Sequence, residues 1–367
     1  MKRILILLTG GTICSTVNPQ SGKSQSHAES TKSLLELDFK KSDSPEADKV
    51  AFEYRFLPTD ILSENMTFDV WEQILFVLRE PGIKSGCDGV IILHGTDTLA
   101  FTASFLALGF AGYPIPILMV SAQLSLDREK TNGYANFRAA VELIAGGIAP
   151  NVYAVYRNVK GKDHDPDGML LHYGSHLLQC PNGSDSFHSR DELVVPDEKC
   201  ARLTGNASKG EPIAYKIKGI CPSVLLLSPY VNLCYDRIPL DGVCAIVHGT
   251  YHSESVCIGR ALSSITDKDK LLTLSEVRES DRPYSILTLL WRAEREGIPV
   301  FLAPCDKEGS KYGTTANAIE QGAVPIPSIT SESAYAKAVL GCSLGLRGKE
   351  LCEFMAKEIN GELENKA

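Results

Sequence analysis

Short apolar runs alternate with longer amphipathic stretches over roughly the first 160 residues. The runs typical of buried strands cover residues 3–8, 51–56, 89–93, 116–121 and 152–156. The stretches with helical periodicity cover residues 68–79, 98–110 and 136–144. Because the strand runs are apolar throughout, they predict a parallel sheet with helices on both faces.

The alternation stops near Lys160 and resumes near Gly219. Polar, Gly- and Pro-rich sequence between them predicts a long interdomain connection with surface loops. Beyond it, strand runs at 224–227, 242–248 and 300–302 alternate with helical stretches at 285–296, 331–340 and 349–358. The predicted fold class is two-domain α/β: a larger, doubly wound, mostly parallel N-terminal sheet with flanking helices, and a smaller C-terminal α/β domain with a parallel sheet. The predicted boundaries are an N-terminal domain at 1–190, a linker at 191–218 and a C-terminal domain at 219–367.

Two polar clusters follow apolar runs directly. Thr9-Gly10-Gly11-Thr12 follows the first run, and His94-Gly95-Thr96-Asp97-Thr98 follows the third. Carboxyl ends of parallel strands meet at the edge of a sheet where ligands bind, so we expect both clusters to line one pocket. Thr12 and Thr96 are the candidate nucleophilic hydroxyls, and Asp97 is the only acid adjacent to either.

A phosphate-binding turn is the alternative interpretation of these glycine turns. The chain contains neither GxxxxGK[ST] nor GxGxxG, so the usual markers of nucleotide binding are absent.

Length and composition place the chain among ordinary globular proteins. Its 367 residues suit two domains, and it is 44% hydrophobic and 22% charged. A net charge of −8 argues against a nucleic-acid partner. The apolar residues 4–8 are too short for a signal peptide, and no run approaches the ~20 residues of a membrane span. We therefore predict a cytoplasmic protein without a membrane partner.

Eleven cysteines are scattered along the chain without CxxC spacing. In a cytosolic protein this pattern predicts small buried hydrophobic residues, with neither a disulfide framework nor a zinc site.

The two polar clusters resemble the hallmark motifs of bacterial-type L-asparaginases. Further similar segments are Ser63–Met66, Val120–Gln123, Asn132–Asn136, Leu225–Pro229 and Gly249–Ser253. The likeness is good over residues 1–157 and weaker from 213 onward. It identifies the chain as a divergent member of the family, of the cytoplasmic type I-like kind.

The resemblance implies roles for seven site residues. Thr12 is the implied nucleophile, and Thr96 activates or positions the attacking group. Asp97 and Glu64 bind the substrate α-ammonium, and Ser63 binds its α-carboxylate. The backbones of Gly11 and Ala122 meet the developing oxyanion, where one donor contributes ~3 kcal/mol.

The resemblance also implies partners: a small amide substrate, no cofactor, no metal, and a homodimer or homotetramer. The predicted reaction is hydrolysis of L-asparagine to L-aspartate and ammonia through an acyl-enzyme. The alternatives are an amino-acid-binding pseudoenzyme and an amidase of another small amide, including a subunit that releases ammonia for an amidotransferase.

The chain departs from the family pattern in two places. The family has a tyrosine on a loop after the first threonine, whereas residues 14–53 contain none. Aligning the segment at Gly174 puts His176 at the family's arginine and Gln179 at its lysine. Glutamine cannot serve as a base near neutral pH; Lys160 or Lys162 replaces the lysine only through a register shift.

Two histidines, His248 and His252, have the i, i+4 spacing of metal ligands on a helix. Gly249-Thr250 indicates a strand end and a loop here, so we predict no metal. His252 falls where the family often has a substrate-contacting asparagine, and its near-neutral titration makes it a candidate for the missing base. His94 is expected to anchor its turn.

Overall fold

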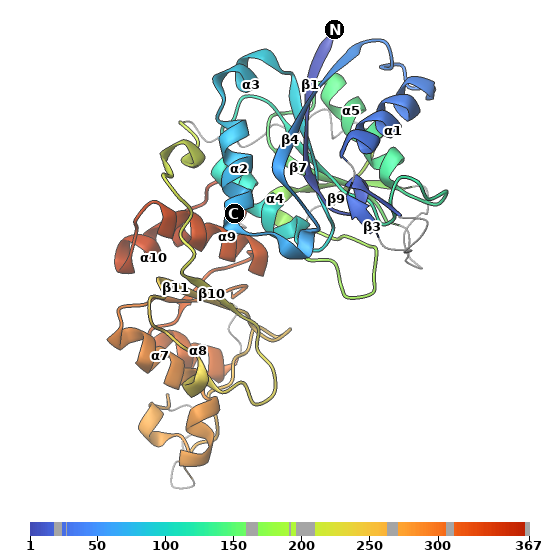
Figure 1. Ribbon diagram of the computed structural model, residues 1–367. Helices are drawn as coiled ribbons and strands as arrows, with labels where there is room; N and C mark the ends of the chain where they lie inside the picture. Colours follow the sequence, from blue (N-terminus) through green and yellow to red (C-terminus); the bar gives the residue numbers. More distant parts are fainter. Residues whose placement is uncertain are drawn as a thin grey trace. The chain divides into compact units, whose positions relative to one another are not determined.

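The computed structural model describes residues 1–17, 24–26, 28–158, 168–190, 192–195, 210–262, 271–305 and 312–363. The chain divides into two compact units, Met1–Lys216 and Ile217–Ala367 (Figure 1). The predicted boundaries at 190 and 218 stay predictions. Lys160 and Lys162 lie outside the described residues.

The first unit is built on one large sheet in the order β4-β1-β5-β6-β7-β8-β9. Its strands are β1 (Lys2–Gly10), β4 (Val50–Ile61), β5 (Gly89–Leu93), β6 (Ile117–Val120), β7 (Val152–Arg157), β8 (Met169–Tyr173) and β9 (Glu192–Val195). The five strands from β4 to β7 are parallel, and β8 and β9 add antiparallel. The predicted doubly wound, mostly parallel sheet is confirmed.

The polar segment between 160 and 219 does more than connect two domains, which is all that its sequence predicts. It contributes β8 and β9, which extend the sheet from β7. Both strands are short and stand in polar, turn-rich sequence, so their β signal is weak against their surroundings.

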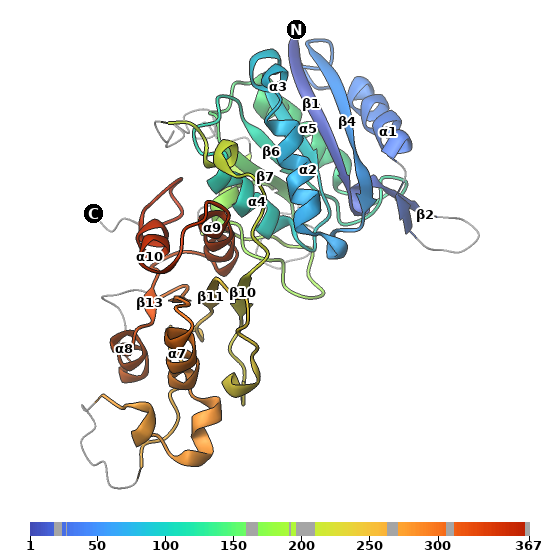
Figure 2. The same ribbon diagram turned by 60° about the vertical axis from the view of Figure 1, so that its left-hand side comes forward.

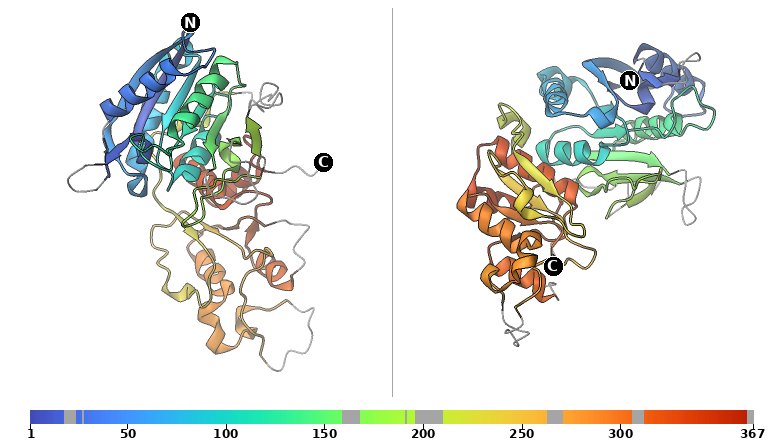
Figure 3. Two further views of the ribbon diagram at one scale, coloured as in Figure 1. Left: turned by 90° about the vertical axis from the view of Figure 1, so that its right-hand side faces the viewer. Right: turned by 60° about the horizontal axis from the view of Figure 1, so that its bottom comes forward.

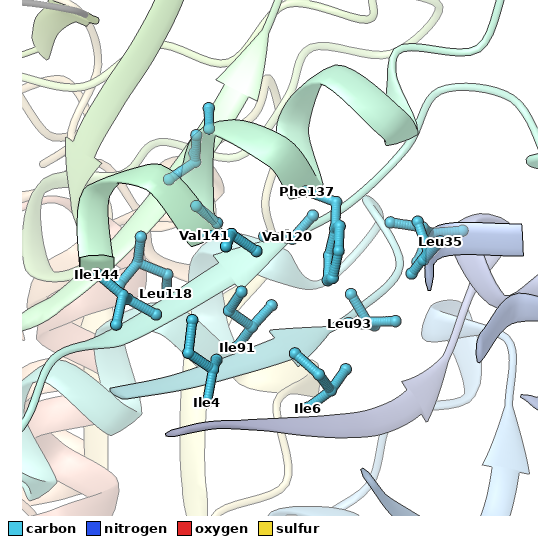
Figure 4. Packing of buried hydrophobic residues seen from close by; sticks show 14 of the residues in the cluster. Ile4, Ile6, Leu35, Ile91, Leu93, Leu118, Val120, Phe137, Val141 and Ile144 are labelled. Carbon is cyan, nitrogen blue, oxygen red and sulfur yellow. The ribbon is translucent and has the colours of Figure 1, made fainter. Parts of the chain in front are cut away.

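Helices cover both faces of this sheet (Figures 1 and 2). Helices α1 (Ala28–Lys41) and α5 (Gly133–Ala145) pack on one face and contact each other. The other face carries α2 (Phe68–Leu78), α3 (Pro81–Gly86) and α4 (Leu99–Gly109). In the α1/α5 layer, apolar side chains of the central strands meet those of α5, among them Ile4, Ile91, Leu118, Phe137 and Val141 (Figure 4).

The second unit has its own parallel sheet, in the order β10-β11-β12-β13, as predicted. Its strands are β10 (Val224–Leu227), β11 (Ala245–His248), β12 (Val300–Leu302) and β13 (Val324–Pro325). Helices α7 (Ile286–Arg295) and α8 (Gly313–Glu320) cover one face, and α9 (Ser331–Ser343) and α10 (Gly348–Ala356) the other (Figure 3). The predicted α/β fold of this unit is confirmed.

A hairpin and several short 3₁₀ turns complete the described elements. The hairpin pairs β2 (Ser15–Val17) with β3 (Ser24–Ser26). The 3₁₀ turns are η1 (Thr12–Cys14), η2 (Ser63–Asn65), η3 (Gly174–His176), η4 (Ile213–Lys216), η5 (Tyr235–Arg237), η6 (Leu274–Glu276) and η7 (Glu279–Tyr284). Within the described ranges, no helix has the length and apolar character needed to cross a membrane.

A buried ion pair joins α9 to the chain that follows α10. The Lys337 ammonium lies 2.6 Å from the Glu362 carboxylate, and both side chains are fully buried. Glu362 also accepts hydrogen bonds from the backbone N–H groups of Ile359 and Asn360, while Lys337 donates to the Lys357 carbonyl. Every charge of the pair is therefore hydrogen-bonded, which a buried ion pair requires.

Candidate active site

The two polar clusters lie side by side at the carboxyl edge of the first sheet. Strands β1 and β5 are parallel neighbours, with Leu8 opposite Leu93. The Thr9 hydroxyl donates to the Leu93 carbonyl at 2.9 Å. The chain beyond β1 turns into η1, which begins at Thr12. Thr12 and Thr96 are both half-buried.

Glycines allow the segments around this edge to approach closely. Gly11 has a φ of +83°, and a Cβ there would lie 2.3 Å from the Cα of Gly95. A Cβ on Gly95 would in turn lie 2.3 Å from the Ser63 hydroxyl oxygen. The backbones next to Thr12 and Thr96 are therefore in direct contact, and the turn carrying Ser63 packs against them.

Ser63 connects its turn to the second cluster. Its hydroxyl donates to the Asp97 carboxylate at 2.9 Å and accepts from the Asp97 N–H at 3.2 Å. The Thr98 hydroxyl donates to the Ser63 carbonyl at 2.9 Å. Ser63 is buried, whereas Asp97 and Glu64, the residue after Ser63 on η2, are exposed. The Asp97 carboxylate is thus fixed by a buried hydroxyl while remaining open to solvent.

The end of β6 is tied to the same edge. Ser121 donates its hydroxyl to the His94 carbonyl, and Asn136 donates its side-chain amide to the Ser121 carbonyl at 2.9 Å. Ala122 follows, with 1% of its surface exposed. The sequence pattern places Asn136 only at a helix start, so its role in holding the strand ends together was missed.

His94 anchors its turn, as expected. Its Nδ1 lies 2.7 Å from the Gly95 carbonyl oxygen, which can only accept, so Nδ1 carries the proton. Complete burial lowers the pKa of His94 to about 4. The ring is therefore neutral near pH 7 and does not add a positive charge to the site.

Gln179 reaches the second cluster from the segment after η3. Its side-chain amide donates to the Asp97 carbonyl. The preceding His176 points its Nε2 toward Arg190, with 2.9 Å between the nitrogens. A neutral amide therefore stands beside the Thr96-Asp97 backbone, at the position where the resemblance expects a lysine.

The serines that follow Thr12, where the family has its tyrosine, differ in their surroundings. Ser15 is buried, and its hydroxyl donates to the Gly11 carbonyl at 2.9 Å. This bond holds the turn before Thr12. Ser21 lies outside the described residues, as does the side chain of Ser24.

The second unit holds His248 and His252. The buried His248 ring contacts the Tyr235 hydroxyl at 2.8 Å and the Gly249 carbonyl at 2.5 Å, so both its nitrogens are engaged. His252 is exposed in the turn after β11. Among the residues that the structure describes, no group of three or more His, Cys, Asp or Glu side chains is placed to hold a metal ion.

Comparison with known proteins gives one family match, which covers much of the first unit. Residues 3–159 match the family model described as "Asparaginase, N-terminal". Solved structures agree on the fold: the thermostable L-asparaginase from Thermococcus kodakarensis has a TM-score of 0.73 at 19% identity, covering 99% of this chain and 100% of its own. L-asparaginase I from Vibrio cholerae has a TM-score of 0.72 at 20% identity, covering 99% of both chains.

Sequence relatives carry a different name, since each is named as one of the subunits of a glutamyl-tRNA(Gln) amidotransferase. The Methanosphaera stadtmanae protein is 24% identical over 99% of this chain and 77% of its own length. The Aeropyrum pernix protein is 26% identical over 92% of this chain and 73% of its length. The Methanosarcina acetivorans protein is 33% identical, over 53% of this chain and 43% of its length.

These relatives overturn the predicted partners. Exclusion of nucleic acid from a net charge of −8 is wrong, since the relatives are named for a tRNA. Charge summed over a chain reports neither a local basic surface nor contacts made through another protein. The relatives' names also describe one part of a larger assembly, unlike the predicted homodimer or homotetramer.

Proposed function

We propose that this chain, a divergent member of the bacterial-type L-asparaginase family, hydrolyses the side-chain amide of L-asparagine to L-aspartate and ammonia with Thr12 as nucleophile. The observation that carries the proposal is the direct contact between the Gly11 and Gly95 backbones. It brings Thr12 and Thr96 to one edge of the sheet. The hydrogen-bonded pair of Ser63 and Asp97 lies beside them.

The reaction proceeds in two steps. The Thr12 hydroxyl oxygen attacks the amide carbon, and the oxyanion that develops is stabilised by backbone N–H groups around Gly11 and Ala122. Collapse of this intermediate takes up a proton on nitrogen and releases ammonia, leaving an ester on Thr12. Water then hydrolyses the ester, releasing L-aspartate and restoring the hydroxyl.

Substrate binding uses the groups around η2. The exposed carboxylates of Asp97 and Glu64 attract the α-ammonium of an amino acid, and the Ser63 hydroxyl lies 2.9 Å from Asp97 to meet its α-carboxylate. Two anionic groups beside one hydroxyl suit a zwitterionic amide better than a neutral one.

Thr96 positions the attacking group and the later water. The neutral Gln179 next to it cannot take up their protons. Because a general base contributes ~10²–10⁴-fold, we expect turnover slower than in an enzyme with lysine here.

A second candidate function is ammonia release within an amidotransferase that modifies a tRNA-bound amino acid. The amidotransferase relative that spans 99% of this chain favours it. The same Thr12 chemistry supplies the ammonia in this case, so the two candidates differ in what stimulates turnover and in the fate of ammonia.

The test is ammonia release by the purified chain from L-asparagine, L-glutamine and D-asparagine. We expect release from L-asparagine and a loss of at least ~100-fold in Thr12→Ala and Thr96→Ala. Thr67→Ala is the matched control, because this exposed threonine makes no side-chain capping bond at α2. Equal release by wild type and both site variants would contradict the proposal.

Two outcomes separate the alternatives. Stabilisation by L-aspartate without ammonia release would identify an amino-acid-binding protein without turnover. Release that rises when glutamyl-tRNA(Gln) is added would favour the amidotransferase role.

A further inference from the structure

Three cysteines that are distant in sequence come together in the second unit. Cys221 precedes β10, Cys244 immediately precedes β11, and Cys342 lies in the last turn of α9. The sulfur atoms of Cys221 and Cys244 are 3.9 Å apart. Cys342 contacts Cys221 through its thiol. The expectation that the cysteines are simply buried is wrong for this group, because Cys221 and Cys244 are only half-buried.

The backbone around the Cys221–Cys244 pair is fixed on both sides. The Cys244 N–H donates to the Ser223 carbonyl at 2.7 Å, where the parallel ladder of β10 and β11 begins. The Cys221 N–H donates to the Ser343 hydroxyl at 2.9 Å. With the backbone held and the sulfurs 3.9 Å apart, side-chain rotation alone can bring them to the ~2.05 Å of a disulfide bond.

Access distinguishes the three thiols. Cys342 has 2% of its surface exposed, whereas Cys221 and Cys244 are reachable from solvent. The exposed Arg347 guanidinium lowers the pKa of Cys244, but burial outweighs it and raises that pKa overall. The pair is therefore mainly in the thiol form at neutral pH, which makes its oxidation slow and faster at alkaline pH.

We propose that Cys221 and Cys244 are a redox modification site, which a peroxide converts into an intramolecular disulfide. One sulfur, as its thiolate, attacks a peroxide oxygen and becomes a sulfenic acid, and the peroxide O–O bond breaks to release water. The second sulfur attacks the sulfenic sulfur, the S–O bond breaks, and a second water leaves. Both thiol hydrogens end in water: the two sulfurs are oxidised by two electrons in total and one peroxide is reduced.

The disulfide links the amino ends of two neighbouring strands. The cysteines are 23 positions apart in sequence, so the cross-link closes a loop that the unfolded chain would otherwise leave open. The link stabilises the second unit without touching the carboxyl edge of either sheet. Excess dithiol reverses it by thiol–disulfide exchange.

The test treats the full chain with hydrogen peroxide, quenches it with alkylating reagent in denaturant, and maps the peptides by mass spectrometry. We expect a Cys221–Cys244 linked peptide about 2 Da lighter than the sum of its reduced parts. The thermal midpoint of the oxidised chain is expected to rise by about 5–10 °C over the reduced chain and to return after dithiothreitol. The rate of linking should increase from pH 7 to pH 9.

Serine variants supply the controls. Cys221→Ser and Cys244→Ser should each abolish the link and the thermal shift, whereas Cys352→Ser, which removes a half-buried thiol on α10, should preserve both. Oxidation of Cys221 to sulfinic acid without a link, or a link between Cys221 and Cys342 in the wild type, would overturn the proposal.

Discussion

Ser63 shows how one side chain organises the candidate site. A buried serine hydroxyl needs hydrogen-bond partners, and this one finds both in Asp97, through its carboxylate and its N–H. A ligand carboxylate approaching Ser63 takes the hydrogen that Asp97 now receives. Binding at Ser63 and the orientation of Asp97 are therefore coupled.

Gln179 gives the first prediction at this scale. We expect Gln179→Lys to raise kcat for L-asparagine at least ~10-fold, because it places an amine that can exchange protons beside the Thr96-Asp97 backbone. Ammonia release under saturating substrate measures it.

Gln179→Met is the matched control for that variant, since it keeps the side-chain length and supplies no base. It should give no gain. An unchanged or lower kcat in Gln179→Lys would mean that a lysine's proton chemistry is not what limits this enzyme.

Sequence identified the residue types of this site better than their contacts. Thr12, Thr96 and Asp97 follow from the two polar clusters, because each cluster directly ends a strand run. The bond from Ser63 to Asp97 spans 34 positions, and that from Gln179 spans 82. Such contacts depend on how the strands are ordered in the sheet, which local patterns do not encode.

At the scale of elements, strand ends position the chemistry. The sheet order places β1, β5 and β6 side by side, so the turns after them share one edge. The close approach of these turns depends on Gly11 and Gly95, where an added Cβ would meet neighbouring atoms at 2.3 Å.

Gly95→Ala tests this approach. The added methyl group would collide with the Ser63 hydroxyl, so we expect a loss of at least ~10-fold in kcat/KM and ~1–3 kcal/mol of unfolding free energy. Urea unfolding and ammonia release measure the two effects.

Gly82→Ala is the control, since a Cβ there, in α3, meets nothing within 4 Å. It should leave activity unchanged. If Gly95→Ala behaves like Gly82→Ala, the contact between the turns is not needed for activity.

Elements with a uniform pattern were predicted closely. The strand at 89–93 matches β5, and the helix at 68–79 matches α2 to one residue. Helix α1 was missed because its sequence is largely polar, with Leu35 and Phe39 among the few side chains that reach the core. Strand β13 has two residues, too few for any periodicity.

At the scale of the whole molecule, buried histidines make stability depend on pH. Burial lowers the pKa of His94 and His248 to about 4 and that of His172 to about 3, from an ordinary value of 6.5. Each is neutral in the folded chain and takes up a proton on unfolding below pH 6.5. The free energy of unfolding therefore falls as the pH drops from 6.5 toward 4.

We expect acidification from pH 7 to pH 5 to lower the free energy of unfolding, by up to about 1.4 kcal/mol per histidine for each pH unit below 6.5. Urea unfolding followed by far-UV circular dichroism measures it. His252→Asn, which removes an exposed histidine, should show the same fall as the wild type. A free energy of unfolding that does not change with acid would show that these rings do not stay neutral in the fold.

The ion pair between Lys337 and Glu362 has a consequence for any protease that reaches the chain after α10. A cut between Lys357 and Glu362 would release a short peptide carrying the carboxylate, and the Lys337 ammonium would then lie in the core without its counter-ion. A buried ion pair that loses one member costs ~3–5 kcal/mol, much of the stability of a typical domain. Nicking a few terminal residues would thus unfold α9 from the sheet it covers and expose the whole second unit to degradation.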